Sequence, residues 1–286
     1  MAAILSTWVI STLAGNGKPG YSGDGGSSAL ACLNEPKGVT LDSHGNVYVA
    51  DSENHAVRKI DRVSGVISTI AGLSVHEDEE TIERPNSTST APEEDPLADP
   101  DPTTGDHSPY TQHTDLSGTV RYWTNKPSPF QRYAGDGGSA VLARLNFPTA
   151  VAVDQEGNVY IADTMNHRIR VVEAATGLMF TLAGTGRAGF SGDGGAAHQA
   201  TLNEPAALVL DETHKLYIAD QSNHRIRVVD LRTGRIQTIV GTGAATYDGD
   251  GKPAINAALA GPSGLALADD RLYIADTFNG RIRCVQ

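Results

Sequence analysis

Several residue types are scarce in this sequence, and each shortage excludes a class of protein. Two cysteines, Cys32 and Cys284, are too few for a disulfide framework or a four-ligand zinc site, so we expect two unrelated free thiols. No apolar run approaches the roughly 18 residues that span a bilayer, so no membrane span is predicted. No basic segment leads into an apolar stretch at the start of the chain, so no signal peptide is visible and the compartment stays open.

Positive charge is also scarce, and the negative charge is unevenly placed. The net charge is −12. Twelve acidic residues and a single base, Arg84, lie within residues 73–118, which leaves the rest of the chain close to neutral. We therefore do not expect a nucleic-acid partner, because phosphate binding needs a basic face. The alternative is a local basic cluster made of Arg168, Arg170, Arg225, Arg227, Arg281 and Arg283.

The sequence does contain a long phrase that recurs. Its clearest copy is PAALVLDETHKLYIADQSNHRIR at Pro205–Arg227, and the others lie at Pro36–Arg58, Pro148–Arg170 and Pro262–Arg283. The interval between the first two copies is about twice each later interval, so one repeat length between them lacks the phrase. A fixed period of this kind indicates supersecondary units that pack against their neighbours.

The sequence pattern of each repeat predicts four short strands. The recurring phrase supplies an alternating strand, a strand ending in YIAD or its equivalent, and a third strand after an Asn-His turn. A β-branched, apolar phrase such as Gly65–Gly72 (GVISTIAG) supplies the fourth, and a glycine-rich connector follows. No helical periodicity is visible. The fold class is therefore all-β, a β-propeller of four-stranded antiparallel blades in which residues 1–286 form a single propeller.

The two ends of the chain predict how the ring closes. Trp8–Gly15 (WVISTLAG) has the pattern of a fourth strand, whereas Arg281–Gln286 has the pattern of a third. We expect the N-terminal strand to join the last blade, because this pairing would remove a free sheet edge.

These motifs resemble the NHL-repeat β-propeller family, which is named for an Asn-His-Leu turn. The turn is represented by Asn54-His55, Asn166-His167 and Asn223-His224, although leucine is replaced in each. The connector, AGxGxxGxSGDGG, is similar to that of the long-repeat branch found in secreted, cell-surface and bacterial proteins. The resemblance implies a ring that commonly has six blades, and this chain shows four clear ones.

Residues 73–118 break the pattern. This segment is acidic and rich in proline, so we expect it to be flexible. Gly118–Thr124 (GTVRYWT) nevertheless lies where another fourth strand is due. Two interpretations stay open: four blades with an insertion, or a degenerate fifth blade, which the length of the segment slightly favours. Asn86 is the only N-glycosylation sequon, and a glycan there would fit an extracellular protein.

The most regular polar positions are interpreted as structural. Each blade has an aspartate and an arginine seven residues apart across one hairpin, with asparagine, and in three blades histidine, in the turn. We expect an ion pair that fixes strand register and contributes about 0–1 kcal/mol when partly exposed. The positions are Asp51, Asn54, His55, Arg58, Asp163, Asn166, His167, Arg170, Asp220, Asn223, His224, Arg227, Asp276, Asn279 and Arg283.

No cofactor or catalytic residue is predicted. Asp248-Gly-Asp250 resembles the start of a calcium loop, but the glutamate that completes such loops is absent, so it is a weak candidate. The turn histidines belong to separate blades and are not expected to converge on one ion.

The sequence favours a non-catalytic interaction scaffold with a protein or glycan partner. One alternative is an enzyme of the lyase or lactonase type with a metal in the central channel, since the resemblance extends to such enzymes. The other is a structural module of a larger assembly or filament.

Overall fold

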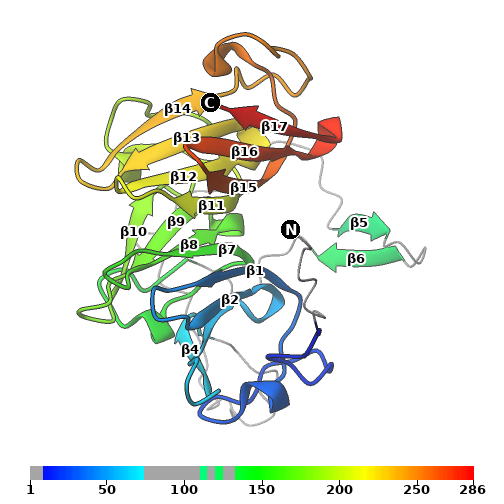
Figure 1. Cartoon of the computed structure of the whole chain (residues 1–286), viewed down its shortest axis with the longest axis vertical. Helices are drawn as coiled ribbons and strands as arrows, with labels where there is room; N and C mark the ends of the chain where they lie inside the picture. Colours follow the sequence, from blue (N-terminus) through cyan, green and yellow to red (C-terminus); the bar gives the residue numbers. More distant parts are fainter. Residues whose placement is uncertain (1–8, 74–109, 115–119, 125–132) are drawn as a thin grey trace, which may run out of the picture. The chain divides into compact units, whose positions relative to one another are not determined.

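The computed structural model describes residues 9–73, 110–114, 120–124 and 133–286. The chain forms two compact units, one made of Met1–Val75 with Gln131–Gln286 and the other of His76–Phe130. The described part of the first unit consists of four antiparallel sheets, each made of strands adjacent in sequence (Figure 1). These sheets are the blades of a propeller, which confirms the expected all-β fold.

The first three blades have four described strands and the last has three. Blade 1 contains β1 (Pro36–Leu41), β2 (Val47–Asp51), β3 (Ala56–Ile60) and β4 (Ile67–Ala71). Blade 2 contains β7 (Pro148–Val153), β8 (Val159–Asp163), β9 (Arg168–Val172) and β10 (Met179–Ala183). Blade 3 contains β11 (Pro205–Leu210), β12 (Lys215–Asp220), β13 (Arg225–Asp230) and β14 (Arg235–Val240). Blade 4 contains β15 (Pro262–Ala268), β16 (Arg271–Asp276) and β17 (Arg281–Val285).

The first strand of every blade begins at a proline. Proline suits this position because it has no N–H to donate to the ladder. The pairing with the second strand is irregular just after it, as between Pro36 and Gly38 in β1. Short 3₁₀ turns lie in two places. Those between the second and third strands are η2 (Ser52–Asn54), η4 (Thr164–Asn166), η6 (Gln221–Asn223) and η8 (Thr277–Asn279), and those in the connectors are η1 (Ser28–Leu30), η3 (Ala140–Leu142), η5 (Ala197–Gln199) and η7 (Ala254–Asn256).

Apolar side chains between successive blades form the core. One cluster joins Val57 and Ala71 of blade 1 to Val151 and Ile161 of blade 2. Equivalent clusters join blade 2 to blade 3 and blade 3 to blade 4. The first strands β1, β7, β11 and β15 contact one another in this order. Each junction therefore uses the same face of one blade and the opposite face of the next.

The predicted closure of the ring is not formed by the described residues. Residues 9–14 are not part of a strand, and β17 has no outer neighbour among the described strands. Val9 is 86% exposed and Ile10 is 97% exposed. The repeat pattern identified a segment that can act as an outer strand, but whether an edge lies within its reach depends on the angles between blades.

The glycine-rich connectors cover the outer strands. Gly25 N–H donates to Ile67 O at 2.9 Å, and Ile67 N–H donates to Gly26 O at 3.0 Å, so the connector lies along β4. Gly194 and Gly195 make the same pair of bonds with Ile236 of β14. The connector thus covers the outer edge of each of these sheets, which is otherwise free to pair with another chain.

Two glycines of one connector provide a matched test of this packing. Both have positive φ, but a Cβ on Gly192 would lie 2.7 Å from Ala200 Cα and Cβ, whereas one on Gly194 meets nothing within 4 Å. Gly194→Ala should cost about 1–2 kcal/mol for its left-handed backbone alone. Gly192→Ala should cost about 1–3 kcal/mol more, measured by urea unfolding, because the loop must shift. Equal losses would show that the connector packs loosely.

The second unit has a much smaller described part. Strands β5 (Tyr110–Thr114) and β6 (Val120–Thr124) pair antiparallel. β6 lies in the segment where a fourth strand was expected, but its partner is β5 and the described sheet has two strands instead of four. The described residues therefore show four blades and do not support a fifth. Asn86 and residues 74–109 lie outside the described residues.

Candidate functional site

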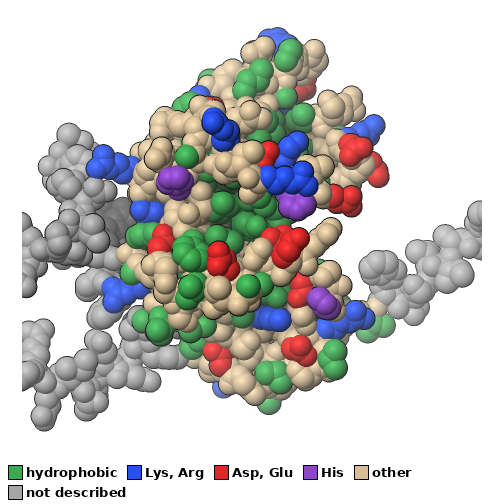
Figure 2. Space-filling model, turned by 90° about the vertical axis from the view of Figure 1, so that its left-hand side faces the viewer, with side chains coloured by type: hydrophobic (Ala, Val, Ile, Leu, Met, Phe, Trp, Pro, Cys, Tyr) green, Lys and Arg blue, Asp and Glu red, His purple; other side chains and the backbone are tan. Residues whose placement is uncertain are grey.

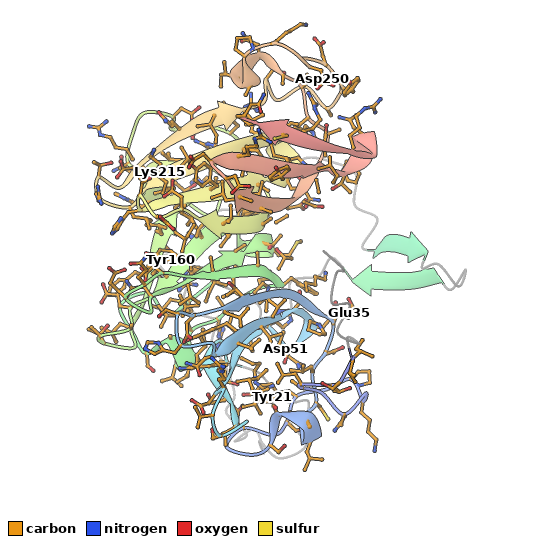
Figure 3. The ribbon with its side chains drawn as sticks, in the orientation of Figure 1. Tyr21, Glu35, Asp51, Tyr160, Lys215 and Asp250 are labelled. Carbon is orange, nitrogen blue, oxygen red and sulfur yellow. The ribbon has the colours of Figure 1, made fainter. Side chains whose placement is uncertain are left out.

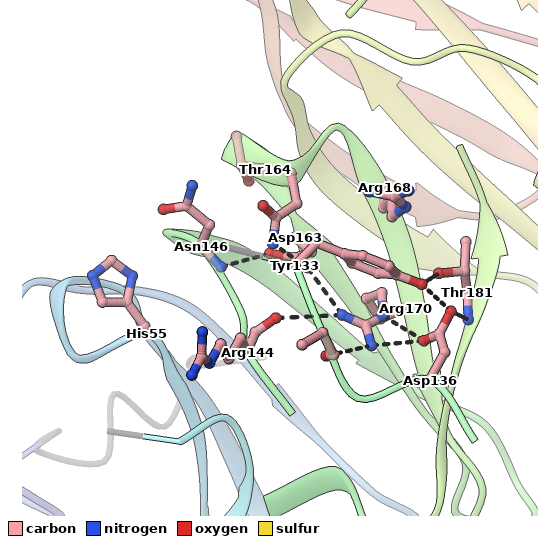
Figure 4. A network of polar contacts seen from close by, with 12 residues as sticks. His55, Tyr133, Asp136, Arg144, Asn146, Asp163, Thr164, Arg168, Arg170 and Thr181 are labelled. Carbon is pink, nitrogen blue, oxygen red and sulfur yellow. Dashed lines mark hydrogen bonds and ion pairs between the residues drawn. The ribbon is translucent and has the colours of Figure 1, made fainter. Parts of the chain in front are cut away.

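A buried arginine lies at the centre of each polar network. Arg58, Arg170 and Arg227 are 0% exposed. In blade 2, Arg170 Nη1 lies 3.4 Å from Asp163 Oδ2 on the neighbouring strand, and Arg170 Nη2 lies 2.6 Å from Asp136 Oδ1 in the connector (Figure 4). Blade 1 repeats this with Asp51 and Asp24, at 3.3 and 2.7 Å from Arg58. The sequence analysis expected a partly exposed pair, but the pair is buried and has a third member.

The turn residues complete the same network. Asp51 Oδ1 accepts from Asn34 N–H at 2.7 Å, and Asp51 Oδ2 accepts from the Asn54 side chain at 2.8 Å. Asn54 also donates to Gly20 O at 2.8 Å. The aspartate, asparagine and arginine therefore tie the hairpin to the connector that precedes it. Asp276, Asn279 and Arg283 make the corresponding contacts in blade 4.

An aromatic ring covers each buried guanidinium. The Arg170 guanidinium lies 4.5 Å from the centroid of the Tyr133 ring, and Arg168 lies 3.7 Å from that centroid. Tyr21, Phe190 and Tyr247 take this place in the other blades, and Figure 3 locates Tyr21 and Asp51 in blade 1. Three members of the basic cluster that was the alternative interpretation, Arg170, Arg227 and Arg283, thus contact aspartates of their own blades.

The two carboxyl groups of the blade 2 network titrate differently. Burial raises the pKa of Asp163, and it raises the pKa of the equivalent Asp220 to about 6. Burial also acts to raise the pKa of Asp136, but hydrogen bonds from Tyr133 and Thr181 and the charge of Arg170 outweigh it and hold that pKa below its usual value. The connector carboxylate is therefore the more persistent counter-charge for arginine.

The turn histidines connect one blade to the next. His55 Nδ1 accepts from Phe147 N–H, His167 Nδ1 from Glu204 N–H, and His224 Nδ1 from Gly261 N–H, each at 3.1 Å. Each histidine also has a left-handed backbone, with φ between 52° and 56°. Gly280 occupies this position in blade 4. The histidines thus join successive blades.

An acidic cavity of about 840 Å³ opens at the end of the first strands. Its wall is built from the turns between the first and second strands of blades 2, 3 and 4. The acidic lining residues are Asp154, Glu156, Asp211, Glu212, Asp269 and Asp270. Among the described residues, no lysine or arginine lines it, and His214 is the one lining histidine. Figure 2 faces this side of the molecule and shows the hollow with acidic, basic and histidine side chains around it.

Some of these carboxylates shape the turns and others are exposed. Asp211 accepts from Lys215 N–H at 2.9 Å and from Thr213 N–H at 2.8 Å. Although burial acts to raise its pKa, these bonds lower the pKa of Asp211, so the group is ionised at neutral pH. Glu156, Glu212, Asp269 and Asp270 are exposed. The cavity therefore presents exposed negative charge in addition to the carboxylates that stabilise its turns.

The calcium candidates already have partners in the protein. Asp248 is 3.0 Å from Lys252 Nζ, and Asp250 is 2.7 Å from an Arg283 nitrogen. Asp250 also accepts from the Tyr247 hydroxyl at 2.7 Å. Among the described residues no group of three or more histidine, cysteine, aspartate or glutamate side chains could hold a metal ion. Cys32 and Cys284 are both free thiols.

Comparisons with known proteins agree with this architecture. A model of the teneurin NHL domain matches residues 11–93, and a model of the NHL repeat matches residues 145–172. The chain is 27% identical to NHL repeat-containing protein 2 of Bos taurus over 304 residues, which cover 93% of this chain and 41% of that protein. It is 30% identical to teneurin-4 of Mus musculus over 234 residues, which cover 72% of this chain and 8% of that protein.

Solved structures show a more distant likeness. Virginiamycin B lyase from Staphylococcus aureus aligns over 88% of this chain and 69% of that one, with 14% identity and a TM-score of 0.37. The chain spans less than half the length of the two curated relatives.

The four repeated sheets and their Asp-Arg-Asp networks define a β-propeller in which the most regular polar positions of the repeat stabilise the scaffold. The chain belongs to the NHL-repeat family, as the Asn-His turns and glycine-rich connectors indicated. No helix in the described ranges is long and apolar enough to cross a membrane.

Proposed function

We propose that the protein is a non-catalytic interaction scaffold that binds a cationic segment of a partner protein at its acidic cavity. The observation that carries the proposal is the composition of that cavity, whose lining, in the part of the chain that the structure describes, has six carboxylate residues and no lysine or arginine. Complementary charge gives a binding surface its specificity and accelerates association. The acidic turns come from three blades, so the rigid scaffold fixes their spacing.

Neutralising the exposed carboxylates tests this function. The variant Glu156→Gln/Glu212→Gln/Asp269→Asn/Asp270→Asn keeps side-chain size, and asparagine tolerates the left-handed backbone of Asp269 and Asp270. A short lysine- and arginine-rich peptide should bind the wild type and lose affinity about ten-fold or more in the variant, because each partly exposed pair contributes about 0.5–1 kcal/mol. Titration calorimetry at two salt concentrations measures the effect, which should shrink at high salt.

A control removes charge elsewhere. Glu35→Gln/Glu53→Gln changes two acidic residues that do not line the cavity. This variant should bind the peptide as the wild type does. The control removes two charges and the cavity variant removes four, so a loss of binding free energy about half as large in the control would mean that only the net charge matters. Absence of peptide binding to the wild type would reject the cavity as a cationic site.

The enzyme alternative rests on a distant likeness alone. Metal analysis of purified protein separates it from the scaffold. A stoichiometric zinc or calcium ion retained through dialysis would favour a lyase- or lactonase-type enzyme.

A further inference from the structure

The outer side of β17 is built to receive a strand. In the other blades the connector binds the fourth strand through two adjacent residues, such as Gly25 and Gly26 with Ile67. Gly251 and Lys252 take these places in blade 4, and no described strand lies opposite them. The polar contacts of the connector are already formed, since Asp250 contacts both Arg283 and the Tyr247 hydroxyl. Blade 4 therefore has the receiving side of an outer strand, and none of the described strands occupies it.

The segment before blade 1 makes the backbone hydrogen bonds that, elsewhere in the chain, follow an outer strand. Gly15 N–H donates to Ser28 O and Asn16 N–H donates to Ala31 O, both at 2.9 Å. The residues after β4 and β10 make the same two bonds to the next blade, as Gly184 and Thr185 do to Ala197 and Ala200. Residues 9–14 therefore stand in the same relation to blade 1 as β4 and β10 do to the blades that follow them.

The apolar residues of this segment lack the burial of their equivalents. The sequence aligns Ile10 with Ile67, Met179 and Ile236, which are 0% exposed, whereas Ile10 is 97% exposed. Thr12 aligns with Thr69 and Thr181, which contact the hydroxyls of Tyr21 and Tyr133. The partner that this alignment gives Thr12 is Tyr247, in the blade that lacks its outer strand.

One face of β1 and one face of β17 are also exposed, and their equivalents in the other blades lie on opposite sides of a junction between blades. Val39 of β1 is 68% exposed, but its equivalent Val151 is 5% exposed against the preceding blade. Ile282 of β17 is 73% exposed, but its equivalent Val57 is 0% exposed against the following blade. The exposed face of β17 is thus equivalent to the faces that pack against the next blade at three junctions within the chain, and β1 carries the equivalent of the receiving face.

We propose that these surfaces bind a second copy of the chain, with residues 9–15 of each copy adding to β17 of the other. Within one chain, three similar junctions set the blade angles, and with these angles residues 9–15 do not pair with their own β17. Two copies of four blades make a ring of eight, which lies within the range of known propellers. The contact joins two different surfaces, a β17 face and a β1 face, so it closes with two copies when the four blades of one chain span half of the ring.

The register of the other blades gives a direct test. Lys59 pairs with Ser68, Val171 with Phe180 and Val228 with Gln237, so the equivalent pair is Cys284 with Ser11. One chain would carry Ser11→Cys, Cys284→Ser and Cys32→Thr, and the other would carry Cys32→Thr alone. After the two are mixed and mildly oxidised, a disulfide between the positions can form only between chains. We expect a covalent dimer on a non-reducing gel.

The control moves the thiol to the other face of the same strand. Thr12→Cys in place of Ser11→Cys turns the sulfur away from Cys284, because successive side chains of a strand alternate. It should give little dimer. Absence of cross-linking from Ser11→Cys would overturn the proposal.

The state of the wild-type protein gives a second measurement. Sedimentation at micromolar concentration should show twice the chain mass of 30.0 kDa. Ile10→Asp should give the single-chain mass with unchanged circular dichroism, because Ile10 makes no buried contact within one chain. Two results together would overturn the proposal in favour of closure within one chain. They are a monomeric wild type and, in a Ser11→Cys variant that keeps Cys284, a disulfide between these two positions of the same chain.

Discussion

Arg170→Ala should lower the free energy of unfolding by about 3–5 kcal/mol, because removing one member of a buried ion pair leaves the other uncompensated. Arg170 is 0% exposed and contacts two aspartates as well as the carbonyl oxygens of Ala134 and Arg144. Without it, Asp163 keeps only the donors of Asn146 and Asn166. Urea unfolding at neutral pH measures the loss.

Two further variants separate charge from packing. Arg271→Ala removes an exposed arginine at the start of β16 and should change stability by less than about 0.5 kcal/mol. Arg170→Met with Asp163→Asn should lose less than Arg170→Met alone, because the double variant leaves no buried carboxylate. If the single and double variants were equally stable, the ion pair would not be the source of the effect.

Acidification should weaken the junctions between blades. Burial lowers the pKa of His55 and His167, so the folded protein favours their neutral forms. Their contribution to stability is present above the unfolded pKa of about 6.5 and is lost as the pH falls through that value towards the lower folded ones. A protonated Nδ1 cannot accept from the facing backbone N–H, which should cost about 1–3 kcal/mol for each histidine.

The double variant His55→Asn/His167→Asn isolates this effect. Asparagine can accept a hydrogen bond, tolerates the left-handed backbone and does not titrate. Between about pH 7 and pH 5 the wild type should lose stability relative to the variant. Carboxyl groups titrating in this range, including Asp220 with a pKa of about 6, are common to both chains and cancel in the difference. Parallel stability curves would contradict the prediction.

The pattern within each repeat was enough to predict the strands, because alternating apolar residues and turn residues determine strands through neighbours that are close in sequence. A spacing of seven across a hairpin likewise places Asp51 next to Arg58. Asp24, the second partner of Arg58, lies 34 residues earlier, and only the path of the connector brings it close. Its recurrence within the chain as Asp136, Asp193 and Asp250 was the available signal.

Contacts between blades could not be derived in the same way. His55 faces Phe147, which is 92 residues away, and local pattern does not specify that distance. The acidic cavity combines turns from three blades whose sequences differ, so no repeated motif marks it. The missing closure has the same origin, since the pattern of Trp8–Gly15 describes a strand but not the position of its partner.

The division of contacts has an evolutionary consequence. Each arginine network closes within one repeat, from its connector to its third strand. The junction between repeats uses apolar surface and hydrogen bonds in which at least one partner is a backbone group, including the bond that each turn histidine accepts from a backbone N–H. A backbone group is present whatever the neighbouring sequence, so a repeat can be duplicated, lost or replaced by recombination without redesigning the ion pairs of its neighbours. We therefore expect that copying one repeat changes the blade number without requiring new ion pairs in the neighbouring repeats.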